Sequence, residues 1–543
     1  MDESGDLKRG SAADRLDALL WFVVPVLILS TLPIGFVSND GFGHSRDFAA
    51  GTWHLNPNHL FFEPLGAWWQ NFWTRNGSAR EPVDILKLLS VLSGGLAAGG
   101  FRYGVAPRLA ETRWAANHAT AWLAFSSAFL RLWVSDEIHM IQMPFVVGMV
   151  WTALVYLERP SFSRALVLGA MAGLSALAFI SNLVLGAAVA AALAIWHFSR
   201  REPSLAVRNA GTIGLGALLV AGPIFLVAWL HSPGAPGFLA WLTRYSGGRQ
   251  TARLHEAYGL VGSWTGLAES AARSVYGTAS ALVDLTPVAA AVRDRQPPTL
   301  GVILGVIAFL AASAALLYGL ATALRQPSQP ANRSTLMIGA AWLAAILGFG
   351  VFWNNSDDQF YFQMAPAFGA LAARIPGRRG RSGVVFLMLS LTGLLWNWID
   401  VGSKRVFYPR WQRMALLERE VRGACLVVYP GFDEAEMLLS LSRPAKSVPR
   451  ISMTHLASRY PVEEGIRRLT GNIEHCLETG GRVILIDIFN TPPDRNPWKF
   501  LRRLGYDHLA VERTLKERFF LEPTSRQVGP FRVRAVAFPG GHE

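Results

Sequence analysis

Long apolar runs constrain the fold of this chain more than any other feature of its sequence. The first, Leu19 to Val37 (LLWFVVPVLILSTLPIGFV), has the length of about 17–25 residues that a helix needs to cross a bilayer. Spans of this kind are predicted at residues 17–36, 84–101, 115–133, 140–156, 164–180, 183–198, 209–230, 299–323, 335–353, 360–373 and 383–402. Only 16% of the 543 residues are charged, against about 25% in a soluble domain. The sequence therefore predicts a polytopic α-helical membrane protein with about 11 transmembrane helices.

Basic residues are distributed unevenly between the two sides of these spans. One set of connections carries many Lys and Arg, including Arg102, Arg159 and Arg325, whereas the short turns VSDEIH, SN and NNSDDQ carry none. Lys and Arg in short loops favour the cytoplasmic side, so we expect the N-terminus inside and the protein in the plasma (inner) membrane. The net charge of +13 follows from this topology and does not indicate a nucleic-acid partner. The charged N-terminal stretch shows no small-residue cleavage site after the first run, which favours an uncleaved first helix.

Eleven spans place the C-terminus outside and divide the chain into two parts. Residues 1–402 form the transmembrane domain, with larger outer loops at 38–83 and 231–298, and residues 403–543 form an extracytoplasmic domain. In that tail, ACLVVYP, RVILIDIF and FRVRAVAFP are typical of strands, whereas PVEEGIRRLTGNIEHCLETGG and NPWKFLRRLGY are typical of helices. This order predicts a C-terminal soluble α/β domain. It contains neither G-x-G-x-x-G nor a phosphate-loop pattern, so nucleotide binding has no local support.

The two cysteines, Cys425 and Cys476, both lie in the tail. They are too few for a disulfide framework and have no metal-ligand spacing. One bridge forms between them if the region is oxidised; two unpaired buried thiols are the alternative.

The first outer loop opens with SNDGFGHSRDFAAGTWHLNPNHLFFEP, which presents several ionisable groups directly after a membrane span. Two residues, Ser38 and Asn39, separate Asp40 from the apolar run. Asp40 is the candidate general base, with His44, Asp47 and Glu63 as candidate substrate-binding residues. The aromatic segment HLFFEPLGAWWQNFWTR is typical of a helix lying in the membrane interface. The loop therefore suits a substrate with a polar head and a lipid tail. His44, His54 and His59 have no spacing that requires a metal.

Two further outer turns carry acidic residues. LRLWVSDEIHMIQMP holds Asp136, Glu137 and His139, with Arg131 about one helical turn deeper and able to pair with a carboxylate or a lipid phosphate. WNNSDDQFYFQMAP supplies Asp357 and Asp358 before Tyr361. If these turns converge on one cavity, they form a site for acid–base chemistry or for a divalent cation.

The motifs NDGFGHSRDFAAG, SDEIH and DDQFYFQMAP, together with the topology, resemble the GT-C superfamily of polytopic glycosyltransferases that use polyprenyl-phosphate sugars. This superfamily includes protein mannosyltransferases and the aminoarabinose transferase of lipid A. The resemblance implies a hexosyl or pentosyl transferase with Asp40 as catalytic carboxylate, assisted by Asp136 and Glu137. If a metal is present (Mg or Mn), Asp40, Asp136 and Glu137 are its expected ligands. The implied partners are a polyprenyl-phosphate sugar donor, membrane lipids, and a lipid, glycan or protein acceptor.

The long loop 231–298 is expected to bind the donor phosphate through Arg244, Arg249 or Arg253, since outer loops of the resembled superfamily often close over the donor. A basic loop meeting anionic headgroups is the simpler explanation. The acids, likewise, have a structural interpretation as helix caps or solvated loop residues. Lys87, in the second span, is expected to extend its ammonium group to the outer interface.

Two other functions are consistent with many spans and several charges. A transporter or flippase of a lipid-linked or anionic solute is expected to place its polar groups near the midplane, in two similar halves. Here the charges gather at one face and the halves differ. A non-catalytic membrane assembly protein, in which Asp40 is structural, is the third possibility.

Overall fold

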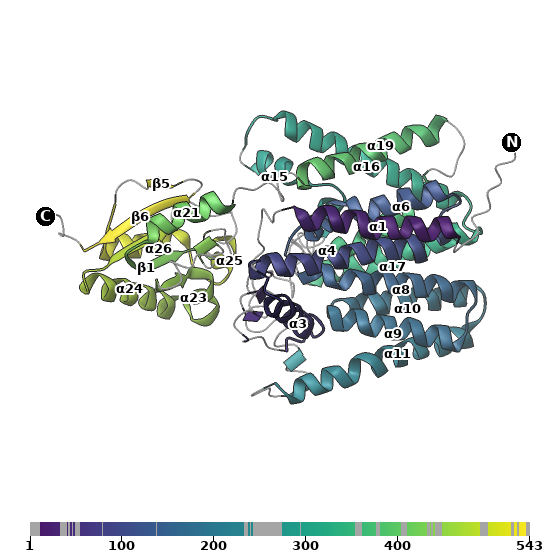
Figure 1. The fold of residues 1–543 in the computed structure, drawn as a ribbon, viewed down its shortest axis with the longest axis horizontal. Helices are drawn as coiled ribbons and strands as arrows, with labels where there is room; N and C mark the ends of the chain where they lie inside the picture. The colour runs from purple at the N-terminus through teal and green to yellow at the C-terminus, as the bar shows by residue number, and fades with distance from the viewer. Residues whose placement is uncertain are drawn as a thin grey trace. The chain divides into compact units, whose positions relative to one another are not determined.

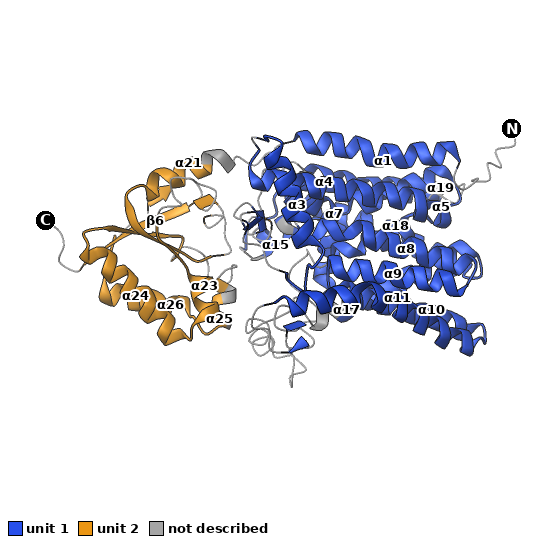
Figure 2. Ribbon diagram, turned by 60° about the horizontal axis from the view of Figure 1, so that its bottom comes forward, with its two compact units in different colours: residues 1–36, 43–245, 264–407 blue, residues 37–42, 246–263, 408–543 orange. Residues whose placement is uncertain are grey.

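The structure, a computed structural model, consists of two compact units, which are shown in different colours in Figure 2. Unit 1 comprises residues 1–36, 43–245 and 264–407, and unit 2 comprises residues 37–42, 246–263 and 408–543. The structure describes residues 11–32, 41, 44–45, 47–48, 51, 55–78, 80–136, 138–232, 237–238, 241–242, 274–293, 295–352, 361–375, 381–402, 410–431, 435, 438–439, 448–488, 498–522, 526–528 and 531–538. Each unit is described by itself.

Unit 1 is a bundle of long helices (Figure 1). In chain order its principal elements are α1 (Ala12–Thr31), α3 (Phe62–Arg75), α4 (Pro82–Gly100), η1 (Phe101–Val105), α5 (Ala106–Leu109), α6 (Arg113–Phe125), α7 (Ser127–Trp133), η2 (Ile138–Gln142), α8 (Met143–Glu158), α9 (Phe162–Ala178), α10 (Asn182–Ser199), α11 (Pro203–Leu230), α15 (Thr286–Arg293), α16 (Leu300–Arg325), α17 (Pro330–Phe352), η4 (Phe362–Met364), α18 (Ala365–Ala372), α19 (Arg381–Asn397) and η5 (Trp398–Gly402). Every predicted span coincides with one or more of these helices. Six helical segments among the described residues are long and apolar enough to cross a bilayer.

The predicted span 115–133 is interrupted. Ser126 has an extended backbone (φ −61°, ψ 144°) and separates α6 from α7. Its hydroxyl bonds the carbonyl oxygen of Leu123 at 3.1 Å, which satisfies the polar group inside the bundle. The turn that contains Asp136 follows α7, the second of these two helices.

Helices α9 and α11 pack backbone against backbone through three glycines. A Cβ added to Gly169 would lie 2.2 Å from the carbonyl oxygen of Ile213, and one on Gly173 would lie 2.8 Å from that of Ala217. From the other helix, a Cβ on Gly216 would lie 2.5 Å from the carbonyl oxygen of Leu166. Small residues allow the close helix contacts that stabilise bundles in lipid, so these positions form what we call the glycine seam.

The charged start of the chain is bound inside unit 1. Arg102 of η1 is fully buried, and its Nη2 lies 2.9 Å from Asp14 Oδ1 and 2.6 Å from Asp17 Oδ2, both on α1. Arg113 Nε of α6 donates to the same Asp17 carboxylate at 2.7 Å, and Asn117 Nδ2 does so at 3.0 Å. These charges therefore tie α1, η1 and α6 together.

Unit 2 is an α/β sandwich, as the sequence predicted. Its elements are α21 (Arg410–Val421), β1 (Ala424–Tyr429), β2 (Arg450–Ser452), α23 (Met453–Arg459), α24 (Val462–Glu478), β3 (Arg482–Ile486), α25 (Trp498–Arg503), α26 (His508–Arg518), β4 (Phe520–Leu521), β5 (Arg526–Val528) and β6 (Phe531–Ala537). The sheet order is β2-β1-β3-β6-β4, with β5 also paired to β6. Strands β1, β2 and β3 are parallel, and β6 runs antiparallel to β3.

The sheet of unit 2 is covered on both faces. Leu426 and Val428 of β1 pack into one apolar cluster with α23 and α24, whereas Val427 and Tyr429 pack into another with α21. Strands buried on both faces have continuous apolar sequences, which explains ACLVVY and RVILI.

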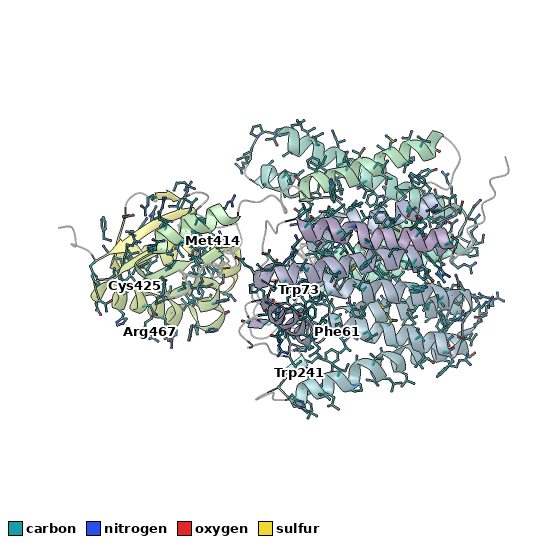
Figure 3. The ribbon with its side chains drawn as sticks, in the orientation of Figure 1. Phe61, Trp73, Trp241, Met414, Cys425 and Arg467 are labelled. Atoms are coloured by element: carbon teal, nitrogen blue, oxygen red, sulfur yellow. A yellow bond between two sulfur atoms is a disulfide. The ribbon has the colours of Figure 1, made fainter. Side chains whose placement is uncertain are left out.

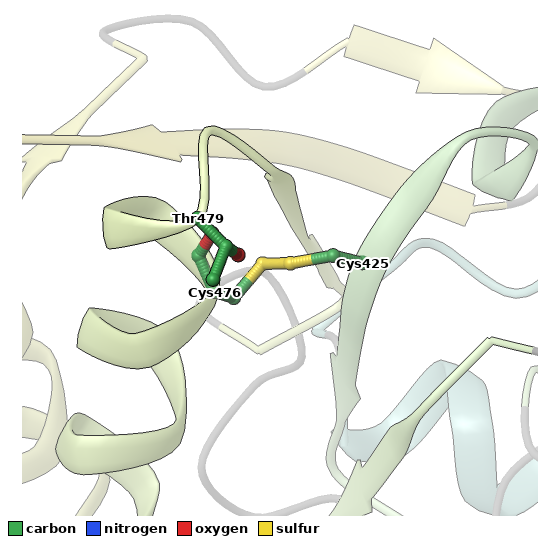
Figure 4. The surroundings of a disulfide bond; sticks show 3 residues. All are labelled: Cys425, Cys476 and Thr479. Atoms are coloured by element: carbon green, nitrogen blue, oxygen red, sulfur yellow. A yellow bond between two sulfur atoms is a disulfide. The ribbon is translucent and has the colours of Figure 1, made fainter.

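A disulfide joins Cys425 of β1 to Cys476 of α24, with the Cα atoms 6.0 Å apart (Figure 4). The two alternatives left open by the sequence are thereby resolved in favour of one bridge. Gly481, just after α24, lies against it, since a Cβ there would be 2.5 Å from Cys425 Sγ. The bond fixes α24 to β1, a strand inside the sheet.

Candidate active site

The expected site residues divide into two groups. His44, Asp47, Glu63, Arg131, Asp136 and Tyr361 are described by the structure. Asp40, Glu137, Asp357, Asp358, Arg244, Arg249 and Arg253 lie outside the described residues. The geometry below therefore concerns the first group and the residues that surround it.

The first outer loop is attached to the turn between α9 and α10 by two backbone hydrogen bonds. The amide of Phe61 donates to the carbonyl of Leu177 at 2.9 Å, and the amide of Ile180 donates to the backbone carbonyl of Asn58 at 3.1 Å. Leu60 and Phe61 also share an apolar cluster with Phe225 and Trp241. Figure 3 labels Phe61 and Trp241 of this cluster. The loop is thus held on the end of the bundle where α1 ends and α4 begins, which we call the site end.

Helix α3 presents one aromatic face outward and one face inward. Trp68 and Phe72 are 58% and 45% exposed and stack with ring centroids 5.9 Å apart. Glu63 and Gly66 face inward, and the Phe48 ring fits so closely over Gly66 that a Cβ there would lie 2.4 Å from it. Exposed aromatic rings on a helix of this kind are typical of a membrane interface.

His44 and Glu63 form a pair inside this loop. His44 Nδ1 lies 3.2 Å from Glu63 Oε1; the Glu63 side chain is 5% exposed and the His44 side chain 19%. Phe62 packs edge-on to the His44 ring at 4.9 Å, and Phe48 stacks on it at 5.9 Å. A carboxylate placed behind an imidazole fixes the orientation of its ring and its tautomer.

A line of histidines connects the first outer loop to the second. The His59 ring lies 6.0 Å from that of His44 and 6.1 Å from that of His139 on η2, and it stacks on Phe179 at 5.1 Å. Part of His59 remains exposed, but its imidazole is enclosed by these rings. Loss of hydration, reinforced by His44 and His139, holds the pKa of His59 well below its ordinary value of 6.5. His59 is therefore neutral at pH 7.

Asp136, in the turn between α7 and η2, is fully buried, whereas Arg131 on α7 is half-buried. A carboxylate removed from solvent is costly unless its surroundings compensate the charge. Asp136 is therefore not a solvated loop residue, whereas its role in the site and its alternative role at the start of the next helix both stay predictions.

Three buried amide side chains join the second outer turn to α10 and to the third turn. Gln363 Nε2 donates to Gln142 Oε1 at 2.7 Å and to Asn182 Oδ1 at 2.8 Å, and Asn182 Nδ2 donates to Gln142 Oε1 at 2.8 Å. Sequence reasoning missed this amide cluster. A signal existed, because IQMP and FQMAP each place a Gln shortly before the Pro that begins a helix, α8 or α18.

Tyr361 and Lys87 are both enclosed. The Tyr361 ring covers Gly277, where a Cβ would lie 2.2 Å from it, so Tyr361 contributes to packing at this end. The ammonium of Lys87 donates to the carbonyl of Leu32, directly after α1, and the residue is 3% exposed. The ammonium of Lys87 is enclosed and not exposed as expected, because the Leu32 carbonyl after the end of α1 accepts a hydrogen bond from it.

The described parts of the three outer connections therefore meet at the site end through the loop bonds, the histidine line and the amide cluster. Within the residues that the structure describes, no group of three His, Cys, Asp or Glu is arranged to hold a metal ion.

A bundle of long apolar helices with a separate α/β unit is the architecture of a polytopic membrane protein. No protein-family model and no curated protein sequence matches the chain. Its structure is similar to the crystal structure of ArnT from Cupriavidus metallidurans bound to undecaprenyl phosphate, over 96% of this chain and 97% of the other, with 13% identity and a TM-score of 0.51. It is also similar to archaeal oligosaccharyltransferase AglB from Archaeoglobus fulgidus in complex with an inhibitory peptide and a dolichol-phosphate, over 98% and 75%, with 14% identity and a TM-score of 0.51.

These similarities confirm the resemblance at the level of the fold. The chain has the fold of the GT-C membrane glycosyltransferases, with a small C-terminal sheet region.

Proposed function

We propose that this protein is an integral-membrane glycosyltransferase that moves a sugar from a polyprenyl-phosphate donor to an acceptor on the outer face of the membrane. The observation that carries the proposal is the meeting of three outer connections at one end of a GT-C-fold bundle, with the His44–Glu63 pair and buried Asp136 among them. A carrier with alternating access needs its polar site near the midplane instead.

In the proposed reaction the acceptor hydroxyl attacks the anomeric carbon of the donor sugar. Asp40 accepts the hydroxyl proton as general base, the bond between the anomeric carbon and the phosphate oxygen breaks, and polyprenyl phosphate leaves. Asp136 and Glu137 assist Asp40. Arg131, Asp47, Arg244, Arg249 and Arg253, with Asp357, Asp358 and Tyr361, are the residues that we propose contact the donor or acceptor.

An apolar groove supports a lipid-linked donor. It has a volume of about 430 Å³, lies among α9, α10 and α11, and includes Gly186, Gly214 and Phe225 in its lining. Phe225 also belongs to the cluster that holds Leu60 and Phe61 of the first loop. A groove of this chemistry accommodates part of an isoprenoid chain whose phosphate lies at the site end.

The disulfide supports an extracytoplasmic position for the C-terminal domain, which we propose comprises residues 403–543. Structural disulfides form in the periplasm and outside the cell and are rare in the cytosol. The same orientation places the N-terminus in the cytoplasm and the site end at the outer face.

The test is a transfer assay with purified protein and a panel of hexosyl and pentosyl polyprenyl phosphates. We expect at least one donor to be consumed, with transfer reduced at least about 100-fold by Asp40→Asn and strongly by Asp136→Asn. A correctly inserted wild type that consumes none of the donors, or an Asp40→Asn variant of full activity, contradicts the proposal.

A further inference from the structure

The two side chains of the His44–Glu63 pair differ in their exposure to solvent. The carboxylate is buried behind the ring, while the imidazole keeps part of its surface open. Phe48 and Phe62 hold the ring from two sides, so the direction in which it presents its second nitrogen is restricted. An imidazole oriented by a buried carboxylate is a common arrangement for transferring a proton.

The depth of this pair follows from α3. Glu63 is in the first turn of α3, and the exposed rings of Trp68 and Phe72 one and two turns further place this helix at headgroup level. The phosphate of a membrane lipid lies at the same level. With α3 in the membrane interface, as we predict, the pair would lie at the level of a lipid-linked phosphate.

The groups that titrate around His44 are few among the described residues. Glu63 faces it from α3, His59 faces it from the same loop, and His139 of η2 lies beyond His59. Asp47 is one turn away on the same segment, and Asp136 begins the neighbouring connection. Because its pKa is lowered, His59 is neutral and adds no positive charge beside His44.

We propose that His44 is the general acid of the transfer, and that Glu63 is the positioning residue that holds it. This inference rests on the proposed function. As the bond between the anomeric carbon and the phosphate oxygen breaks, its electron pair stays on that oxygen, and the His44 imidazolium gives it a proton. The imidazole is left neutral and regains a proton from solvent, while the proton of the acceptor hydroxyl goes to the general base. Glu63 stabilises the imidazolium before the step.

The first experiment measures kcat and donor KM across pH 5.5–9 for the wild type, His44→Gln, Glu63→Gln and a matched control, His231→Gln. His231 is an exposed histidine after α11 at the site end, and its Nδ1 is 2.8 Å from the Val227 carbonyl oxygen. We expect His44→Gln to lower kcat about 100-fold with little change in KM, and to abolish the fall of kcat at high pH. His231→Gln should match the wild type.

Glu63→Gln separates a positioning role from a merely structural one. Without the carboxylate, the fall of kcat should move to lower pH by about one unit, because the imidazolium loses its counter-ion. A structural role would lower thermal stability and activity without moving the profile. If His44→Gln does not fold, the shift in Glu63→Gln still decides the question.

The outcomes distinguish this inference from the function on which it rests. A wild type that transfers no sugar contradicts both the proposed function and the general-acid role of His44. A wild type that transfers sugar, with His44→Gln retaining its kcat or Glu63→Gln retaining the wild-type pH profile, overturns the general-acid role alone.

Discussion

The guanidinium Nη2 of Arg102 lies 2.6 Å from the carboxylate Oδ2 of Asp17, and both side chains are buried between α1 and η1. Asp14 shares the same guanidinium at 2.9 Å. Two helices distant in sequence are therefore held by charges that have almost no access to solvent.

Replacing Arg102 by Met should destabilise unit 1 by about 3–5 kcal/mol, since the buried Asp14 carboxylate would lose this cation and Asp17 would keep only Arg113. The check is the thermal unfolding temperature in detergent, compared with Arg325→Met, an exposed arginine at the end of α16. An Arg102→Met protein as stable as this control would show that the network contributes nothing.

Removal of the disulfide should loosen unit 2. A Cys425→Ser, Cys476→Ser double variant is expected to lose about 2–4 kcal/mol of stability in that unit, because the bridge closes a loop over a sequence separation of 51. Limited proteolysis of the full chain measures this. In the wild type, maleimide should label the cysteines only after reduction; labelling without reductant would contradict the bond.

The low pKa of His59 predicts a loss of stability in acid. The unfolded chain takes up a proton near pH 6.5 that the folded loop excludes, so stability is full above that pH and falls as pH decreases below it. The contribution is at most about 1.4 kcal/mol at pH 5.5. Thermal unfolding measured from pH 7.5 to 5.5 should show a smaller decrease in His59→Gln than in the wild type; equal decreases would argue against a buried neutral His59.

Helix α3 should lie in the membrane interface. A spin label on Phe72→Cys in vesicles is expected to be accessible to oxygen dissolved in the lipid, whereas one on Asn76→Cys, just past the helix end, should be more accessible to a water-soluble relaxation agent. The accessibility is measured by electron paramagnetic resonance. Equal exposure of both labels to the aqueous agent would place α3 in water.

The elements that sequence could predict were those defined by local pattern. The apolar runs became helical, although the run 115–133 is divided at Ser126, and ACLVVYP and RVILIDIF contain strands, as their length and residue types predicted. The amphipathic α3 followed from its aromatic spacing in the same way.

The contacts of the candidate site could not be predicted because they depend on how helices rotate and how deep they lie. Gln142 and Gln363 are 221 residues apart in the chain. The local sequence around each glutamine does not show that the two side chains meet inside the bundle. The surroundings of Lys87 could not be predicted from the sequence either. Its position near the end of a span suggested an exposed ammonium, but the neighbouring helix end supplies an internal acceptor for it.

The glycine seam has a consequence for the biogenesis of the protein. Its two partners are separated by α10, so the seam cannot close until all three segments have left the ribosome and entered the bilayer. Until then the backbone atoms of α9 at its two glycines are exposed to lipid or to the insertion machinery. A bulky residue at Gly169 should therefore impair the packing of α9 against α11 during assembly, before catalysis is affected.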